Sequence, residues 1–106
     1  MLINWVYLLA AILFEVLGTT CMKLSEGFNN LIPSILIFVF YGCGFTFSTL
    51  ALEKLDISFA YSIWSGLGTA LIASIGIIWF RESMSLVKFA SIALIIMGVI
   101  GINASK

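Results

Sequence analysis

Four long apolar stretches, separated by short polar segments, make up nearly the whole of this sequence. They cover residues 3–22, 31–52, 57–80 and 86–102. Each is long enough to cross the hydrocarbon of a bilayer, which takes about 20 helical residues. Backbone amides in lipid must be paired internally, and these stretches lack the alternation of barrel strands, so we expect helices. The pattern predicts an all-α membrane protein with four transmembrane helices in a single domain, residues 1–106.

The polar residues between the stretches indicate where the helices begin and end. Gly27 and two asparagines predict a loop over 23–30, and Pro33 suits the first turn of the next helix, where a missing amide is tolerated. Asp56 and Ser85 are the expected N-caps of the third and fourth helices. Short loops make consecutive helices antiparallel. Because no basic segment precedes the first stretch, we expect it to be retained rather than cleaved as a signal peptide.

Composition excludes several classes of function. Of the 106 residues, 62% are hydrophobic and 9% are charged, which is far more apolar surface than a soluble enzyme needs. Cys21 and Cys43 have no metal-ligand spacing and the chain has no histidine, so we expect small core residues and no metal site. No nucleotide loop or nucleophile-base pair indicates catalysis or a cofactor. The five basic residues are scattered, which argues against nucleic-acid binding.

Glu15 is the exception to a simple charge pattern. The other nine charged residues lie outside the apolar stretches or at their ends, whereas Glu15 lies in the middle of the first one. An acid at the bilayer centre costs about 2.5–3.5 kcal/mol, so such residues face a protein interior or a wet cavity and take part in proton or ion chemistry. A hydrogen bond that only packs two helices is the alternative interpretation.

Small residues surround Glu15 at helical spacing. Ala11, Gly18 and Thr19 lie three or four residues away and would let a ligand or another helix approach the carboxylate closely. Ordinary helix packing explains the same residues equally well. Tyr7, close to the edge of the bilayer, is a further candidate for the binding site with the same ambiguity.

Aromatic side chains on two other helices are candidates for binding an organic cation. Tyr61, Trp64 and Ser65 share one face of the third helix, well inside the span. An aromatic wall attracts a cation through its π-face by about 0.5–2 kcal/mol per contact. Tyr41 and Phe45 follow one another at helical spacing on the second helix, where a packing stripe is the alternative.

Glycines and small residues predict a bend and a contact surface. Gly66 and Gly68 either weaken the third helix, so that its halves tilt independently, or pack closely against a neighbour. The fourth helix carries a stripe of small and branched residues that suits a helix-helix seam, and we interpret it as the dimer interface. This stripe consists of Ser91, Leu94, Ile95 and Gly98.

The distribution of basic residues gives almost no preference for one orientation in the membrane. The first and third loops carry three of them, and the second loop and the termini carry two. The residues are Lys23, Arg81 and Lys88 against Lys54 and Lys106. The α-amino group removes even this difference, so the positive-inside rule predicts dual topology. An antiparallel homodimer would then bring two Glu15 side chains to one site and resemble the inverted repeats of secondary transporters.

These residues together resemble the small multidrug resistance family of bacterial transporters. The likeness rests on the four spans and on the segments 15–20, 22–28, 33–34 and 60–68. The resemblance implies a multi-pass protein of the bacterial inner membrane that exports cations in exchange for protons as an antiparallel dimer. Protons and substrate would compete for Glu15 of both protomers, because burial and a second carboxylate favour the protonated form of an acid.

The resemblance also distinguishes two branches of the family. The guanidinium-exporting branch typically carries a tryptophan three positions after the glutamate, and here that position is Gly18, which favours the branch exporting lipophilic aromatic and quaternary ammonium cations. Ser91 departs from the glycine common in the helix-four seam. A guanidinium or guanylurea exporter, one half of a paired heterodimer, and a membrane subunit without transport activity stay open as alternatives.

Overall fold

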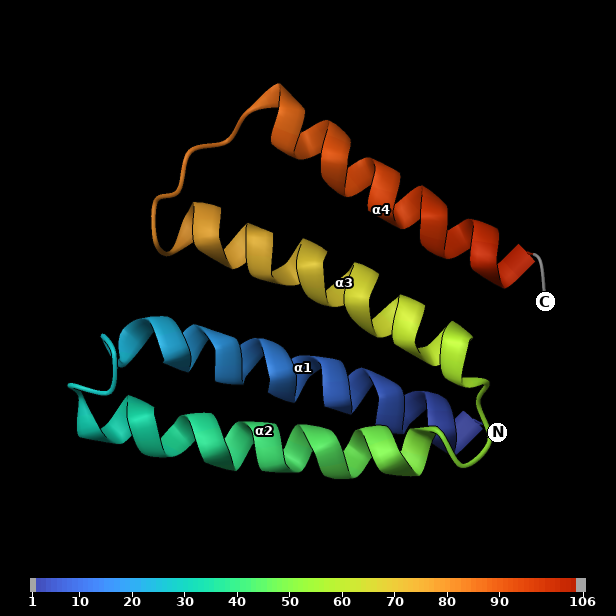
Figure 1. Ribbon diagram of the computed structural model, residues 1–106, viewed down its shortest axis with the longest axis horizontal. Coiled ribbons are helices and arrows are strands. Elements are labelled where there is room, and N and C mark those ends of the chain that lie inside the picture. The colour runs from blue at the N-terminus through green and yellow to red at the C-terminus, as the bar shows by residue number, and fades with distance from the viewer. Residues whose placement is uncertain (1, 105–106) are drawn as a thin grey trace. The chain divides into compact units, whose positions relative to one another are not determined.

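Four α-helices form the protein (Figure 1), as seen in a computed structural model that describes residues 2–104. They are α1 (Leu2–Leu24), α2 (Leu31–Ala51), α3 (Ile57–Ile78) and α4 (Leu86–Ala104). These bounds differ from the predicted ones by no more than two residues, and each helix is long and apolar enough to cross a membrane. The predicted fold class, an all-α protein with four membrane-spanning helices, is confirmed. Lys106, used in the charge comparison, lies outside the described residues.

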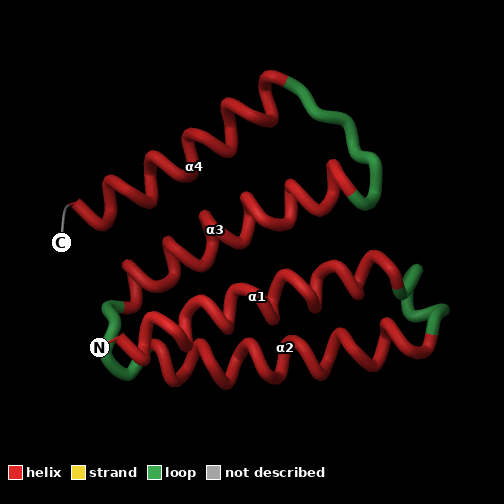
Figure 2. Tube along the Cα trace, turned by 180° about the vertical axis from the view of Figure 1, so that it is seen from behind, coloured by secondary structure: helices red, strands yellow, loops and turns green. Residues whose placement is uncertain are grey.

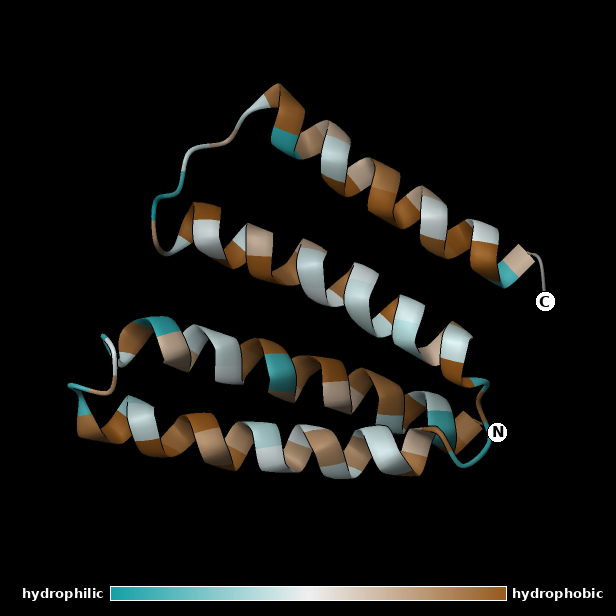
Figure 3. Cartoon of the chain, in the orientation of Figure 1, coloured by the Kyte–Doolittle hydropathy of each residue, from teal (hydrophilic) through white to brown (hydrophobic). Residues whose placement is uncertain are grey.

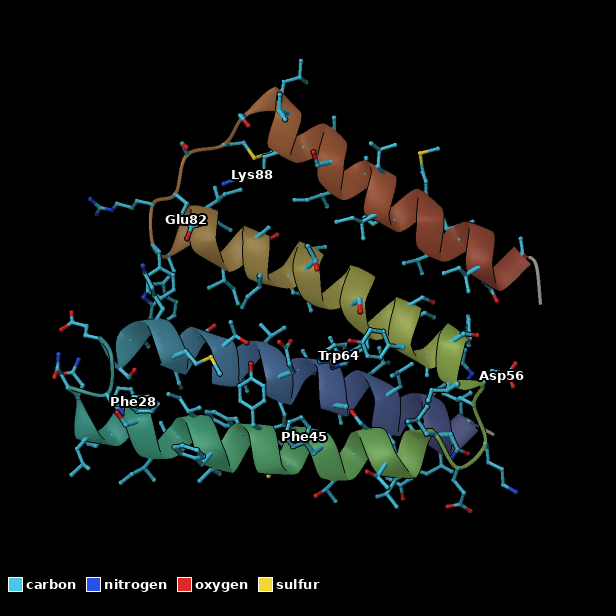
Figure 4. The ribbon with its side chains drawn as sticks, viewed as in Figure 1. Phe28, Phe45, Asp56, Trp64, Glu82 and Lys88 are labelled. Carbon is cyan, nitrogen blue, oxygen red and sulfur yellow. The ribbon has the colours of Figure 1, made fainter. Side chains whose placement is uncertain are left out.

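The two predicted N-caps differ in the structure. Ser85 Oγ accepts a hydrogen bond of 3.0 Å from the backbone N–H of Lys88, which confirms it as the cap of α4. Asp56 occupies the predicted position before α3 with extended backbone, but its side chain makes no capping hydrogen bond, so the prediction that it caps was wrong in that respect. Asp56 is exposed (Figure 4), and water at the membrane surface can satisfy both its carboxylate and the first-turn amides.

A compact loop joins α1 to α2. Glu26, Gly27 and Phe28 all have positive φ angles, of 50°, 69° and 70°, a region that only glycine adopts without steric cost. The side-chain amide of Asn30 donates to the carbonyl of Leu24 at 2.8 Å, which satisfies one of the unpaired carbonyls at the end of α1. The loop therefore reverses the chain within a few residues and makes α1 and α2 antiparallel.

The chain divides into two compact units, Met1–Leu55 and Asp56–Lys106. The first holds α1 and α2, which lie side by side along their lengths (Figures 1 and 2). The second holds α3 and α4, which are more widely separated at the ends that their connecting loop joins. Hydrophobic colours are frequent on all four helices, and pale bands run along α3 (Figure 3). Hydrophilic colours lie at helix ends and in loops, with one further band in the middle of α1. The predicted assignment of residues 1–106 to a single domain stays a prediction.

In the second unit, α4 packs closely against a glycine of α3. A Cβ placed on Gly66 would lie 2.6 Å from Val99 Cγ2 and 3.7 Å from Ile95 Cγ2, so the missing side chain allows this approach. In the loop that follows α3, Arg81 has a positive φ angle of 57°, which turns the chain. The backbone N–H of Glu82 then donates a hydrogen bond of 2.9 Å to the carbonyl of Gly76 in α3. Figure 4 shows Glu82 beside the end of α3. This turn ends α3 at Ile78, two residues before the predicted end.

Candidate functional site

The carboxylate of Glu15 lies half-buried in the middle of α1 and is hydrogen-bonded within the same helix. One turn further along, Thr19 Oγ1 donates a hydrogen bond of 3.0 Å to Glu15 Oε1. Among the described helices Glu15 is the only acidic residue. A single carboxyl group is therefore held in a defined direction inside an otherwise apolar span.

A tyrosine from α2 extends this interaction to a second helix. Tyr41 Oη lies 2.6 Å from Thr19 Oγ1. A hydroxyl group carries one proton, and Thr19 gives its own to the carboxylate, so Tyr41 must be the donor in this contact when Glu15 is ionised. Glu15, Thr19 and Tyr41 thus form a continuous chain of hydrogen bonds between α1 and α2, which we call the hydroxyl chain.

Two glycines allow the helices to come close enough for this chain to form. A Cβ on Gly18 would lie 2.6 Å from Tyr41 Cδ2 and 2.7 Å from Cε2, so the ring lies directly against the backbone of α1. A Cβ on Gly44 would lie 3.5 Å from the carbonyl oxygen of Ala11 and 3.7 Å from the backbone nitrogen of Glu15. Gly18 and Ala11, both predicted from the sequence, therefore lie in the contact between α1 and α2.

Aromatic rings fill the rest of this contact. Phe14 and Phe47 stack with ring centroids 5.6 Å apart and planes only 3° from parallel. Tyr7 lies 5.8 Å from the ring of Phe47, and Phe40 lies 6.1 Å from that of Phe14. Tyr7 was predicted from the sequence, whereas the three phenylalanines were not. Their spacing could have revealed this contact, because Tyr7 and Phe14 on α1 are seven residues apart, as are Phe40 and Phe47 on α2. Residues seven apart share one face of a helix. Tyr7 thus packs in a row of rings.

Phe45, another predicted residue, contacts Tyr41 rather than this row. The two rings are 5.9 Å apart and meet edge to face at 60°. The Phe45 side chain is 65% exposed and extends from α2 (Figure 4). Phe45 therefore supports one side of the Tyr41 ring and leaves its own surface open.

A buried amide also joins α1 to α2 and was missed in the sequence. Asn4 is 4% exposed, and its Nδ2 donates a hydrogen bond of 3.0 Å to the carbonyl of Leu50. That carbonyl belongs to the last turn of α2, where helical carbonyls lack partners within the helix. The sequence could have indicated this hydrogen bond, because Asn4 is a single amide side chain among apolar residues near the start of the first stretch.

The second group of predicted binding residues lies on α3. The rings of Tyr61 and Trp64 are 5.4 Å apart and inclined at 51°. Trp64 and Ser65 are half-buried, whereas Tyr61 is 64% exposed. Figure 4 shows Trp64 on α3. The two rings form one aromatic surface, and their role in binding stays a prediction.

The predicted hinge lies within an unbroken helix. α3 continues through Gly66 and Gly68, and both residues are buried. The contact of Gly66 with Val99 gives one of these glycines a packing role, one of the two interpretations that the sequence left open. Bending at this pair stays a prediction.

The predicted dimer stripe on α4 is accessible within the protomer. Leu94 is 67% exposed and Ile95 is 40% exposed, and a Cβ on Gly98 would meet no atom within 4 Å. The hydroxyl of Ser91 donates to the carbonyl of Val87 at 2.7 Å, so this polar group is satisfied inside its own helix. Leu94 and Gly98 are thus open, Ile95 also borders Gly66 of α3, and the one polar side chain of the stripe is satisfied.

Known proteins identify the family of this chain. The family model described as Small Multidrug Resistance protein matches residues 3–95. An uncharacterized membrane protein, YvaE of Bacillus subtilis, is 53% identical over 94% of this chain and 84% of its own length. Multidrug resistance protein EbrA of Bacillus licheniformis is 38% identical over 99% and 100% of the two lengths. Quaternary ammonium compound-resistance protein QacF of Klebsiella aerogenes is 37% identical over 94% and 91%.

The family model covers the first three membrane-spanning helices and part of the fourth, and the match to EbrA covers 99% of the chain. They indicate a multi-pass protein of the bacterial inner membrane that is not an enzyme. The resemblance seen in the sequence is confirmed: the chain belongs to the small multidrug resistance family.

Proposed function

We propose that this chain is a proton-coupled antiporter that exports lipophilic aromatic and quaternary ammonium cations. The observation that carries the proposal is the single carboxylate of the helices, Glu15, held by Thr19 and connected to the ring of Tyr41. The names of similar proteins, which refer to resistance to multiple drugs and to quaternary ammonium compounds, support multidrug efflux.

The candidate residues match the chemistry of such substrates. The carboxylate of Glu15 supplies the charge that attracts a cation into an apolar span. Rings such as Tyr41 on α2 and Trp64 on α3 offer π-faces, which attract organic cations by about 0.5–2 kcal/mol per contact. Adaptable aromatic and small-residue surfaces recognise many cations, because no fixed array of donors selects one of them.

Coupling to protons follows because the proton and the cation bind the same group, the carboxylate of Glu15. A carboxylate either holds a proton or pairs with a cation, so the two exclude one another at Glu15. In the proposed cycle a cation binds after the proton leaves on one side of the membrane. The protein then changes its opening, and protons displace the cation on the other side. Tyr61 or Ser65 would add a hydrogen bond to the carboxylate in this cycle.

Two protomers in opposite orientations would provide the transport pathway. Members of this family form small oligomers in membranes. The open stripe around Leu94 and Gly98 on α4 offers an apolar contact surface for a second copy. The near-equal basic residues on the two faces favour insertion in both orientations. An antiparallel homodimer would place two Glu15 groups in one pathway, and bending at Gly66 and Gly68 would open it alternately to each side.

The test of proton coupling uses the purified chain in liposomes with an imposed pH gradient. We expect the wild type to move ethidium against its gradient, whereas Glu15→Gln, which keeps shape and loses the charge, should move none. Glu15→Asp is the matched control, because it keeps a carboxylate and should retain transport with a shifted pH dependence. Uphill ethidium transport by Glu15→Gln would disprove the proposal.

A second measurement distinguishes the alternatives. Solid-supported membrane electrophysiology compares currents evoked by guanidinium and by tetraphenylphosphonium. Tetraphenylphosphonium currents alone support the proposal, and guanidinium currents alone identify a guanidinium exporter. The absence of current from the purified chain indicates a heterodimer with a related chain or a subunit without transport activity of its own.

A further inference from the structure

The hydroxyl chain has a direction, and that direction depends on the charge of Glu15. With an ionised carboxylate, the proton of Thr19 points to Glu15 and the proton of Tyr41 points to Thr19. A protonated carboxyl group becomes a donor and can give its hydrogen bond to Thr19 Oγ1 instead. The proton of Thr19 is then released from Glu15, and Thr19 can donate it to Tyr41 while its oxygen accepts from the carboxyl group.

A further acceptor makes this second order of donors possible. Tyr41 Oη lies 4.0 Å from Met22 Sδ, a contact in which the tyrosine is the donor and the thioether sulfur a weak acceptor. Tyr41 therefore has two places for its proton, Thr19 on one side and Met22 on the other. Each hydroxyl keeps its own proton in both arrangements and only rotates, so the chain changes direction without transferring a proton along it.

We propose that Thr19 is a positioning residue that reverses this chain when Glu15 takes up a proton, so that the hydroxyl of Tyr41 turns from Thr19 to Met22. The inference rests on the proposed function, because it assumes that Glu15 exchanges its proton for a cation. It extends that function by giving α2 a means of responding to the charge on α1. Tyr41, whose ring would contact the cation, thereby changes its hydrogen-bond partner each time Glu15 binds or releases a proton.

Gly18 belongs to the same device although it has no functional group. The ring of Tyr41 reaches Thr19 by lying on the backbone of Gly18, and a Cβ there would come within 2.6 Å of the ring. We therefore expect a side chain at position 18 to displace the ring and to break the hydrogen bond between Tyr41 and Thr19. Gly18→Ala thus interrupts the chain without removing any of its hydroxyl groups.

Few other groups in this pair of helices complicate the measurement. Apart from Glu15, α1 carries one charged residue, Lys23 in its last turn, and α2 carries none. The remaining groups able to titrate in the two helices are two tyrosines and two cysteines, namely Tyr7, Tyr41, Cys21 and Cys43. A change in the pH dependence of cation binding that vanishes in Glu15→Gln is therefore assigned to Glu15.

The experiment measures binding of tetraphenylphosphonium to the purified protein by titration calorimetry across pH. Thr19→Val removes the donor that stabilises the ionised carboxylate, so the proton is held more tightly and half-maximal binding moves to higher pH. We expect a shift of about one pH unit. Thr19→Ser keeps the hydroxyl and should restore the wild-type midpoint, which a purely structural role of the threonine methyl group would not permit.

Three further variants test the connections of the chain. Tyr41→Phe and Gly18→Ala should each raise the midpoint by less than Thr19→Val, and Tyr41→Phe added to Thr19→Val should change it no further. Met22→Leu removes the acceptor of the protonated arrangement and should lower the midpoint. Gly42→Ala is the matched control for Gly18→Ala, because a Cβ at Gly42 meets no atom within 4 Å.

The outcomes separate this inference from the proposed function. A wild-type midpoint in Thr19→Val, or additive shifts in Thr19→Val with Tyr41→Phe, overturns the positioning role of Thr19. An unchanged or raised midpoint in Met22→Leu overturns the reversal. Binding by the wild-type protein that is independent of pH, or equal pH dependence in Glu15→Gln, refutes proton competition at Glu15 and the inference with it.

Discussion

The two helical pairs of this protein differ in how much they hold themselves together. α1 buries residues along its whole length, from Asn4 to Cys21, and contacts α2 through polar and aromatic side chains. α4 has no buried residue, and it contacts α3 at Gly66. The difference indicates a division of work. The pair that contains Glu15 is stabilised by contacts between its own two helices. In the other pair, α4 leaves an apolar surface for lipid or a second copy.

The largest expected effect comes from placing the same bulky side chain in each pair. Gly44→Leu would force a leucine between α1 and α2, where a Cβ already contacts Ala11, and should destabilise the protein by about 1–3 kcal/mol. Gly98→Leu meets open space in the protomer and should leave its unfolding unchanged while weakening association. Equilibrium unfolding in mixed detergents and energy transfer between labelled protomers measure the two effects. Equal destabilisation by both variants would contradict the comparison.

A smaller effect is expected at the Gly66 contact of the second pair. Gly66→Ala places a methyl group against Val99 Cγ2 and should cost about 1 kcal/mol of stability. Val99→Ala, combined with Gly66→Ala, should recover most of that loss, because the smaller side chain makes room for the new methyl group. A double-mutant cycle on the free energy of unfolding checks this. Strict additivity of the two substitutions would mean that the contact does not hold α3 and α4 together.

The smallest effect concerns the two helix starts in the second pair. Ser85→Ala removes the hydroxyl that accepts from Lys88 and should destabilise α4 by about 1 kcal/mol. Asp56→Ala, at the start of α3, should cost less, since the Asp56 side chain makes no capping hydrogen bond. Hydrogen exchange at the first turns of α3 and α4 measures both. A larger loss of protection in Asp56→Ala would reverse the assignment of the caps.

The local features of this chain were accessible before its structure. Apolar length predicted the four helices, and Pro33 and Ser85 marked helix starts correctly, because these features depend only on neighbouring residues and on the membrane. The isolation of Glu15 was equally plain, since burying a charge in hydrocarbon is costly whatever lies nearby. The capping role of Asp56 was mispredicted because residue type and position do not fix the side-chain conformation: the backbone of Asp56 is extended, as at an N-cap, but its carboxylate makes no capping hydrogen bond.

By itself the sequence determined the class of protein, its four spans and the acid within the first of them. Spacing along one helix also brought Gly18 and Thr19 to the side of Glu15. Only the tertiary structure decided which residue of α2 meets that acid, because the rotation of two apolar helices about their axes depends on how their surfaces fit. That fit places Tyr41 on Gly18 and within hydrogen-bonding distance of Thr19.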